Sequence, residues 1–221
     1  MTREKDIAFT HDLDGVHFIF APPPVKTTLS LIRRDLKLPL QEVEPEPFVA
    51  QDSLLTRLEN KIKNALHSCR PLHPDSLQTI DLLNLIGSHY HRQLDHFVLS
   101  GREPLLHSLT ERRLCQTGLK AKIPESRLNK SVSASAWKEW QVRNLKNEGY
   151  RTTIHVDDDL RPVLRIARLE GHTLCYLLRN PSNSPLLLRR NGLSLPENVV
   201  SVANFSDMLF DFENRLSSGR I

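Results

Sequence analysis

Residues 151–190 read RTTIHVDDDLRPVLRIARLEGHTLCYLLRNPSNSPLLLRR, and this stretch decides the predicted fold. Apolar runs that favour strands cover 151–156, 163–170, 173–180 and 186–190. Short groups of aspartate, glycine, proline, serine and asparagine separate these runs, and such residues are typical of tight turns. Because tight turns join antiparallel neighbours, the stretch predicts an antiparallel β-meander.

A helix is expected on each side of this meander. Before it, Ser135 is suited to cap a helix over residues 136–148. After it, Ser206 is suited to cap a closing helix, in which Phe205 and Phe210 take the positions of a hydrophobic staple. The C-terminal part of the chain therefore reads as helix, meander and helix.

The N-terminal part predicts a β-hairpin followed by helices. Residues 7–10 and 16–20 favour strands and flank Asp14 and Gly15, a pair suited to a tight turn. Proline-rich residues 38–50 predict an extended linker. Apolar residues then recur with helical spacing, and four helical segments are expected to begin near Ser53, Asp75, Tyr90 and Pro104.

Together these elements predict an α+β fold with an N-terminal β-hairpin, a central helical region, and a C-terminal helix, antiparallel β-meander and closing helix. We expect residues 1–117 to hold the hairpin and the helical region, and residues 136–221 to form the C-terminal region. Residues 118–135 carry four basic side chains and no periodicity, so we expect a basic loop between the two.

Length and composition exclude several classes of protein. The chain has 221 residues, of which 39% are hydrophobic and 25% charged, as in an ordinary globular protein. No apolar run approaches the roughly 18 residues of a membrane-spanning helix, so no membrane partner is expected. The first residues lack the apolar core of a secretory signal, and three scattered cysteines fit a reducing compartment. We therefore expect a cytoplasmic protein, and nothing indicates its oligomeric state.

Positive charge is concentrated in the middle of the chain. The formal net charge is +4, whereas residues 101–155 alone carry 11 Lys and Arg against 5 Asp and Glu. Helical spacing places basic residues of the helix over 136–148 opposite its apolar face, and further arginines follow on the next two predicted strands. This order is similar to a recognition helix followed by a β wing. The candidate contacts to nucleic acid are Lys130, Lys138, Arg143, Lys146, Arg151 and Arg161.

The leading hypothesis is a non-catalytic nucleic-acid-binding protein, with DNA favoured over RNA and a regulatory role. The alternative is a protein-interaction or assembly subunit of a larger complex, so nucleic acid and protein are the expected partners. No nucleophile elbow, Walker loop or zinc-ribbon spacing occurs, so catalysis is not favoured and no cofactor is expected. Equally, the basic residues could form a solvated surface, with Trp137 and Trp140 anchoring the helix to the sheet.

Histidines provide the catalytic alternative. If His89, His91 and His96 converge, they would support a metal-dependent phosphodiesterase or nickase. The segment His89-Tyr90-His91 has the form that relaxases place on a strand. Apolar residues over 90–98 recur with helical spacing instead, which favours a helix and separates the three rings.

Asp157, Asp158 and Asp159 form an acidic run between two predicted strands. Hard cations such as Mg²⁺ prefer several carboxylates, so the run is chemically able to bind one. Three consecutive side chains in a hairpin turn point in different directions, however. We therefore expect a solvated acidic turn and no metal site.

Overall fold

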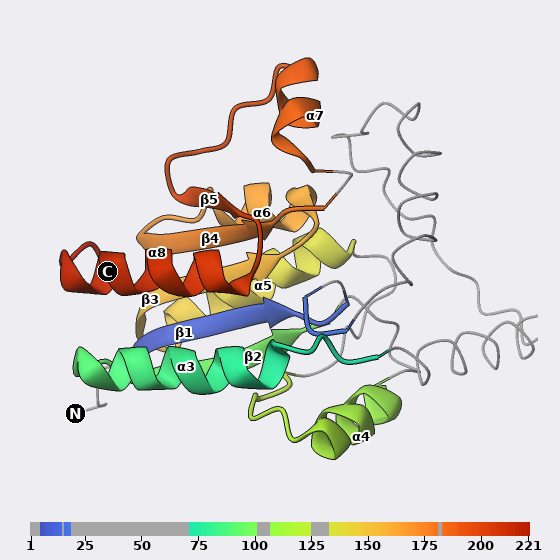
Figure 1. The fold of residues 1–221 in the computed structure, drawn as a ribbon, viewed down its shortest axis with the longest axis vertical. Coiled ribbons are helices and arrows are strands. Elements are labelled where there is room, and N and C mark those ends of the chain that lie inside the picture. The colour runs from blue at the N-terminus through green and yellow to red at the C-terminus, as the bar shows by residue number, and fades with distance from the viewer. Residues whose placement is uncertain (1–4, 15, 19–70, 101–106, 125–132, 181–182) are drawn as a thin grey trace, which may run out of the picture.

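A computed structural model describes residues 5–14, 16–18, 71–100, 107–124, 133–180 and 183–221. Within these residues, one sheet of five parallel strands forms the centre of the molecule, in the order β2-β1-β3-β4-β5 (Figure 1). The strands are β1 (Lys5–Asp12), β2 (Leu94–Leu99), β3 (Tyr150–Asp157), β4 (His172–Leu178) and β5 (Val199–Val202). The described helices are α3 (Ser76–His89), α4 (His107–Thr117), α5 (Ala134–Asn147), α6 (Leu160–Ile166), α7 (Pro185–Arg190) and α8 (Phe205–Ser217).

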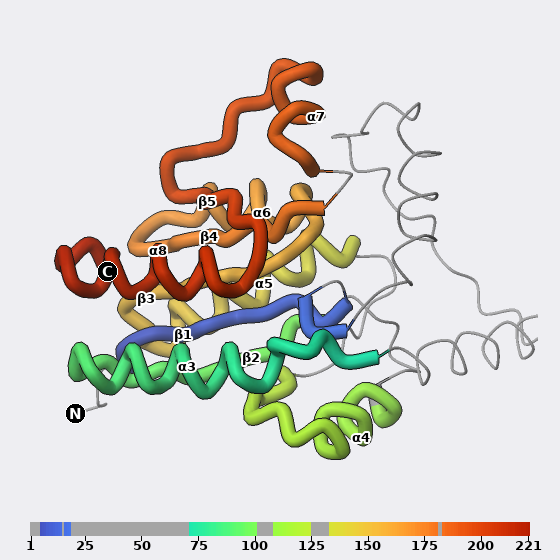
Figure 2. The backbone as a smooth tube through the Cα atoms, viewed as in Figure 1, coloured from blue at the N-terminus to red at the C-terminus, as the bar shows by residue number. Residues whose placement is uncertain are grey.

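Helices cover both faces of the sheet, which makes three layers (Figure 2). On one face, Leu83 of α3 and Phe212 of α8 belong to the same buried cluster as Phe9 of β1. On the other face, Val163 of α6 is buried in a cluster with Cys175 of β4. Strands β1 and β3 are buried along most of their length, as is usual for parallel strands whose two faces are both covered by helices.

The predicted antiparallel meander is wrong, and with it the α+β class. Residues 151–156 and 173–180 do contain strands, β3 and β4, but these strands are parallel neighbours. Residues 163–170 contain most of α6 instead of a strand. The carboxylate of Asp159 caps this helix by accepting a 3.0 Å hydrogen bond from the backbone N–H of Arg161. Parallel neighbours need such a crossover, so this short helix decides the topology.

Residues 186–190 also form a helix instead of a strand. Pro185 occupies the first turn of α7. A backbone N–H in this turn has no acceptor within the helix, so the lack of one in proline costs nothing, and the fixed φ of proline already suits a helix. Leu188 is buried beneath the helix while Leu186 is exposed. The remaining strand is β5, which the sequence patterns do not predict and which pairs with β4.

The predicted N-terminal hairpin is wrong as well. Residues 7–10 lie in β1 as expected, but β2 occupies one edge of β1 and β3 the other. A strand has only two edges, so no further segment can pair with it. The chain turns back after β1, where the N–H of Phe18 donates to the carbonyl of Leu13 at 2.8 Å. Phe18 then forms an isolated antiparallel bridge with Leu72.

The helix predicted around residues 90–98 is replaced by a turn and β2. Helix α3 ends at His89, and His91 adopts a φ of 56°, which a right-handed helix cannot accommodate. Strand β2 begins at Leu94. A Cβ on Gly87 would lie 2.3 Å from the Cδ1 of Leu94, so this glycine lets α3 pack closely against β2.

Four of the predicted helices are confirmed as α3, α4, α5 and α8. Two caps lie two residues earlier than expected, since Ser133 caps α5 and Asn204 caps α8. Phe205 is buried but Phe210 is 69% exposed, so the two do not form a staple. None of the helices in the described ranges is long and apolar enough to cross a bilayer. The linker and the first central helix lie outside the described residues.

The two tryptophans of α5 lie at different depths. Trp137 is 7% exposed and belongs to a core cluster, whereas Trp140 is 55% exposed and does not anchor the helix. We expect Trp137→Ala to lower the free energy of unfolding by about 3–5 kcal/mol and Trp140→Ala by less than about 1 kcal/mol. Urea denaturation followed by circular dichroism measures both. Equal losses would contradict the placement of these rings.

Candidate active site

The order of the strands marks one place in the sheet where a ligand is expected. From β1 the chain moves to β2 on one side, and from β2 it crosses to β3 on the other side of β1. In parallel sheets, ligands bind at the carboxyl ends of the strands at this switch point. Asp12 ends β1 and Asp157 ends β3, so both aspartates lie there. Ser100 directly follows β2, the other neighbour of β1.

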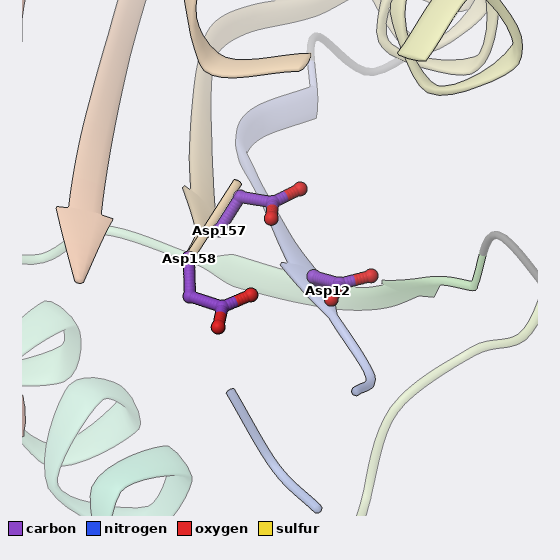
Figure 3. Close-up of side chains that lie close together, drawn as sticks. All are labelled: Asp12, Asp157 and Asp158. Carbon is purple, nitrogen blue, oxygen red and sulfur yellow. The ribbon is translucent and has the colours of Figure 1, made fainter. Parts of the chain in front are cut away.

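Three aspartates meet at this edge of the sheet (Figure 3). Asp12, Asp157 and Asp158 each offer a carboxylate oxygen, and the three oxygens lie within 4.8 Å of one another. The carboxylate of Asp157 is fully buried, that of Asp12 is 9% exposed, and Asp158 is half-buried. The prediction of a solvated acidic turn over 157–159 is therefore wrong. Over the described ranges, no other group of histidine, cysteine and acidic residues could hold a metal ion.

Lys138 of α5 provides the positive charge of the site. Its Nζ donates to Oδ1 of Asp12 and to Oδ2 of Asp157, both at 2.6 Å. The lysine side chain is only 6% exposed, so the predicted position on a solvated basic face is wrong. A buried ammonium needs such partners, because its desolvation costs several kcal/mol. The helix thus turns this lysine toward the sheet together with its apolar residues.

Asp157 accepts further hydrogen bonds from its own segment. The backbone N–H of Asp159 donates to its Oδ1 at 2.8 Å, and His155 Nε2 lies 3.3 Å from its Oδ2. Burial lowers the pKa of His155, so the ring is neutral and donates from Nε2. The other ring nitrogen, Nδ1, lies 2.9 Å from the hydroxyl of Thr10 on β1. Contacts to both oxygens therefore hold the carboxylate of Asp157 in place.

Burial and neighbouring charges shift the pKa values of Asp12, Lys138 and Asp157. Burial opposes ionisation of Asp157, but the charge of Lys138 and the hydrogen bond from His155 lower its pKa to about 2. Burial raises the pKa of Asp12 well above its ordinary value. The charge of Lys138 opposes this rise, and the charges of Asp157 and Asp158 add to it. Although burial opposes the charge of Lys138, the two carboxylates raise its pKa.

The ammonium of Lys138 bonds two of the three carboxylates, those of Asp12 and Asp157. A divalent cation at this point would favour the ionised form of Asp12. All of the available donors are carboxylate oxygens, and such a set fits a hard cation such as Mg²⁺ better than zinc, which prefers imidazole and thiolate.

The histidines do not form the metal site that the catalytic alternative requires. His96 lies on β2, where it is buried and hydrogen-bonded to His11 Nε2 at 3.0 Å and to Asn84 Oδ1 at 3.2 Å. His89 and His91 are exposed at the end of α3. The hypothesis of a phosphodiesterase or nickase that uses these three histidines is therefore wrong.

Two buried histidines, His17 and His96, make the stability of the fold depend on pH. Burial and the charge of His96 lower the pKa of His17 to about 3, and burial lowers the pKa of His96 to about 4. Both rings are neutral in the folded protein. Below about pH 6.5 the unfolded chain takes up protons that the folded protein excludes, so the free energy of unfolding falls as pH falls. Each ring is expected to contribute a loss of about 1.5 kcal/mol between pH 6.5 and pH 5.

The variant His17→Asn isolates one of these contributions. The amide can still reach the Ser76 hydroxyl, which lies 3.1 Å from His17 Nδ1, but it does not titrate. We expect its loss of stability between pH 6.5 and pH 5 to be smaller than that of the wild type by about 1.5 kcal/mol. Urea denaturation at several pH values measures this, with exposed His172→Asn as the control. A variant with the full wild-type loss would contradict the burial of His17 as a neutral ring.

The other predicted nucleic-acid contacts are accounted for in different ways. Arg143 pairs with Glu139 on the same helix, and Arg161 pairs with Asp159. The remaining positions are as follows: Lys146 donates to the carbonyl of Glu170, Arg151 is exposed, and Lys130 lies outside the described residues. The structure thus brings only Lys138 from this set into the carboxylate site.

Sequence reasoning misses the role of Asp12 and misinterprets that of Asp157. The sequence does contain a signal, because each aspartate directly follows a run rich in apolar, threonine and histidine residues that favours a strand: residues 7–11 before Asp12 and residues 152–156 before Asp157. Two buried strands that each end in a carboxylate indicate a common edge only if the strands are parallel. Because the strands were predicted to be antiparallel, the two aspartates were not expected at the same edge of the sheet.

Comparison with known proteins identifies the fold. No protein-family model and no curated protein sequence matches this chain. Two solved structures share its fold. A haloacid dehalogenase-like family hydrolase from Streptococcus pneumoniae has a TM-score of 0.52 and 12% identity, covering 93% of this chain and 97% of that chain. A phosphonoacetaldehyde hydrolase-like protein from Oleispira antarctica has a TM-score of 0.53 and 14% identity, covering 98% and 95%. The chain therefore has the fold of haloacid dehalogenase-like hydrolases.

This fold overturns the prediction of a non-catalytic nucleic-acid-binding protein. The helix and hairpin on which that prediction depended are α5, β3 and the crossover helix α6, so these residues do not form a recognition helix with a wing. The solved structures that share the fold are described as hydrolases, which leaves the regulatory role and the assembly subunit without support. The same likeness contradicts the expectation that catalysis is not favoured.

Proposed function

We propose that this protein is a cation-dependent hydrolase of phosphate monoesters in which Asp12 is the nucleophile. The observation that carries the proposal is the buried ion cluster of Asp12, Lys138 and Asp157 at the switch point of the sheet, with Asp158 beside it. The hydrolases that share the fold support the same class of reaction.

Asp12 is better suited than Asp157 to attack a substrate. Both oxygens of Asp157 accept hydrogen bonds and its carboxylate is fully buried. Asp12 uses Oδ1 for Lys138, and no donor from the described part of the chain bonds its second oxygen. Carboxylates are known as nucleophiles that accept a phosphoryl group. Lys138 would orient this carboxylate and offset negative charge that develops during transfer.

The residues that would hold a cation are Asp12, Asp157 and Asp158. A bound Mg²⁺ would supply Lewis-acid stabilisation of charge on the phosphoryl oxygens. Phosphate esters are the favoured substrates, because Mg²⁺ in enzymes is usually held by one or two carboxylates together with a phosphate of the substrate.

Two more residues are proposed to assist. Asp14 is half-buried and lies two residues beyond Asp12, which makes it the candidate for protonating the leaving alkoxide. Ser100 follows β2 at the same edge of the sheet, where its hydroxyl would bind a phosphoryl oxygen.

Because the thiols of Cys115 and Cys175 are free, we also propose a cytoplasmic location.

Hydrolysis of p-nitrophenyl phosphate and a panel of natural phosphate monoesters tests this function. We expect hydrolysis that requires Mg²⁺, stops on addition of EDTA and returns when Mg²⁺ is restored. The variant Asp81→Asn, which alters an exposed carboxylate on α3, should retain the wild-type rate. Folded protein that hydrolyses no phosphate ester in the panel, or hydrolyses them equally well in EDTA, would contradict the proposal.

A further inference from the structure

Asp158 differs from the other two carboxylates because it lies in the loop after β3. Asp157 is fixed by buried hydrogen bonds at the end of the strand, whereas Asp158 is half-buried. A loop carboxylate binds a cation more tightly when its backbone is already held in place. Two side chains from the segment after β4 bond it.

Two asparagines contact Asp158 directly. Asn180 Nδ2 donates to the carbonyl oxygen of Asp158 at 2.7 Å and to its carboxylate Oδ2 at 3.3 Å. Asn183 Nδ2 donates to the same carbonyl at 2.8 Å and to the carbonyl of Leu178 at 2.8 Å. The loop after β3 is thereby tied to the carboxyl end of β4.

The same two asparagines also hold each other. The backbone N–H of Asn180 donates to Oδ1 of Asn183 at 2.8 Å, and the backbone N–H of Asn183 donates to Oδ1 of Asn180 at 3.1 Å. Since each side-chain oxygen accepts from a backbone N–H, each amide nitrogen must face Asp158. Asn183 is only 2% exposed, so these bonds form away from competing water.

We propose that Asn183, together with Asn180, is a positioning residue that holds Asp158 ready to bind the cation; we call this pair the asparagine clamp. The inference rests on the proposed function, because it assumes a cation at the three carboxylates. Without the clamp, the loop must be ordered when the cation binds, and this free-energy cost is subtracted from the binding energy. Loss of an outer-shell partner typically weakens metal binding by about 10–100-fold.

Asn198 offers a matched control. Its Nδ2 also donates to two backbone carbonyls, those of Ala167 at 2.8 Å and Thr173 at 3.1 Å. Thr173 lies near the amino end of β4, whereas the carboxylates lie at the carboxyl ends of the strands. Asn198→Ala thus removes a similar pair of bonds at the opposite edge of the sheet.

The experiment is a calorimetric titration of Mn²⁺ into wild type, Asn183→Ala and Asn198→Ala, with thermal unfolding in EDTA measured in parallel. We expect both variants to have lower melting temperatures, because each loses buried hydrogen bonds. Only Asn183→Ala should bind Mn²⁺ more weakly, by about tenfold or more. Asn180→Ala, which alters a half-buried side chain, serves as the second variant if Asn183→Ala does not fold.

The outcomes separate this inference from the proposed function. Wild-type affinity in the folded clamp variants, or equal weakening in Asn198→Ala, overturns the role of the clamp while leaving the cation site intact. Absence of Mn²⁺ binding by the wild type overturns the cation site itself, and the clamp with it.

Discussion

Asp12→Asn is expected to lower the kcat of phosphate-ester hydrolysis by about 10³-fold or more. Asparagine has nearly the same shape, so the protein should remain folded. Its amide oxygen carries no charge, however, and cannot take up a phosphoryl group. Lys138 would keep Asp157 as its partner at 2.6 Å, which preserves most of the buried ion cluster.

Steady-state kinetics with p-nitrophenyl phosphate measure the effect of Asp12→Asn. The exposed-site variant Asp81→Asn controls for removal of one negative charge, and its kcat should match that of the wild type. Circular dichroism confirms that both variants are folded. If Asp12→Asn kept more than a tenth of the wild-type kcat, Asp12 would not be the nucleophile.

Lys138→Met is expected to cause a large loss of stability. The substitution keeps most of the apolar stem but leaves the carboxylates of Asp12 and Asp157 buried without their shared ammonium. Removing one partner of a buried ion pair typically costs about 3–5 kcal/mol. Activity should be lost as well, because both carboxylates would then favour their protonated forms.

Urea denaturation in EDTA measures the loss, and Lys146→Met on the same helix is the matched control. Lys146 is half-buried and donates to the carbonyl of Glu170, so its replacement should lower the free energy of unfolding by about 1 kcal/mol. Similar small losses in both variants would show that the ion cluster around Lys138 does not contribute as described.

Several elements of the fold were predictable because their signals are local. Helices α5 and α8 have apolar residues at helical spacing and side-chain caps close by in sequence. The direction of the strands was not predictable in this way. A buried parallel strand and a buried antiparallel strand show the same apolar run, and the distinction depended on α6, which spans only Leu160–Ile166. Its β-branched residues Val163 and Ile166 favour a strand when they are considered alone.

The candidate site was less predictable, because it is built from distant parts of the chain. Lys138 follows an amphipathic pattern that places it on a basic face, and nothing near it in sequence explains its burial. Its two partners are 126 residues away at Asp12 and 19 residues away at Asp157. Only the parallel sheet brings these residues together. The site could therefore not be predicted once the strands were taken to be antiparallel.

The most direct test of the central claim is peptide mass spectrometry of the wild-type protein quenched in acid during turnover of p-nitrophenyl phosphate with Mg²⁺. We predict one phosphoryl group on the peptide that contains Asp12, and none on that peptide when EDTA is present. Hydrolysis that proceeds while this peptide stays unmodified, and that continues at the wild-type rate in Asp12→Asn, would contradict it.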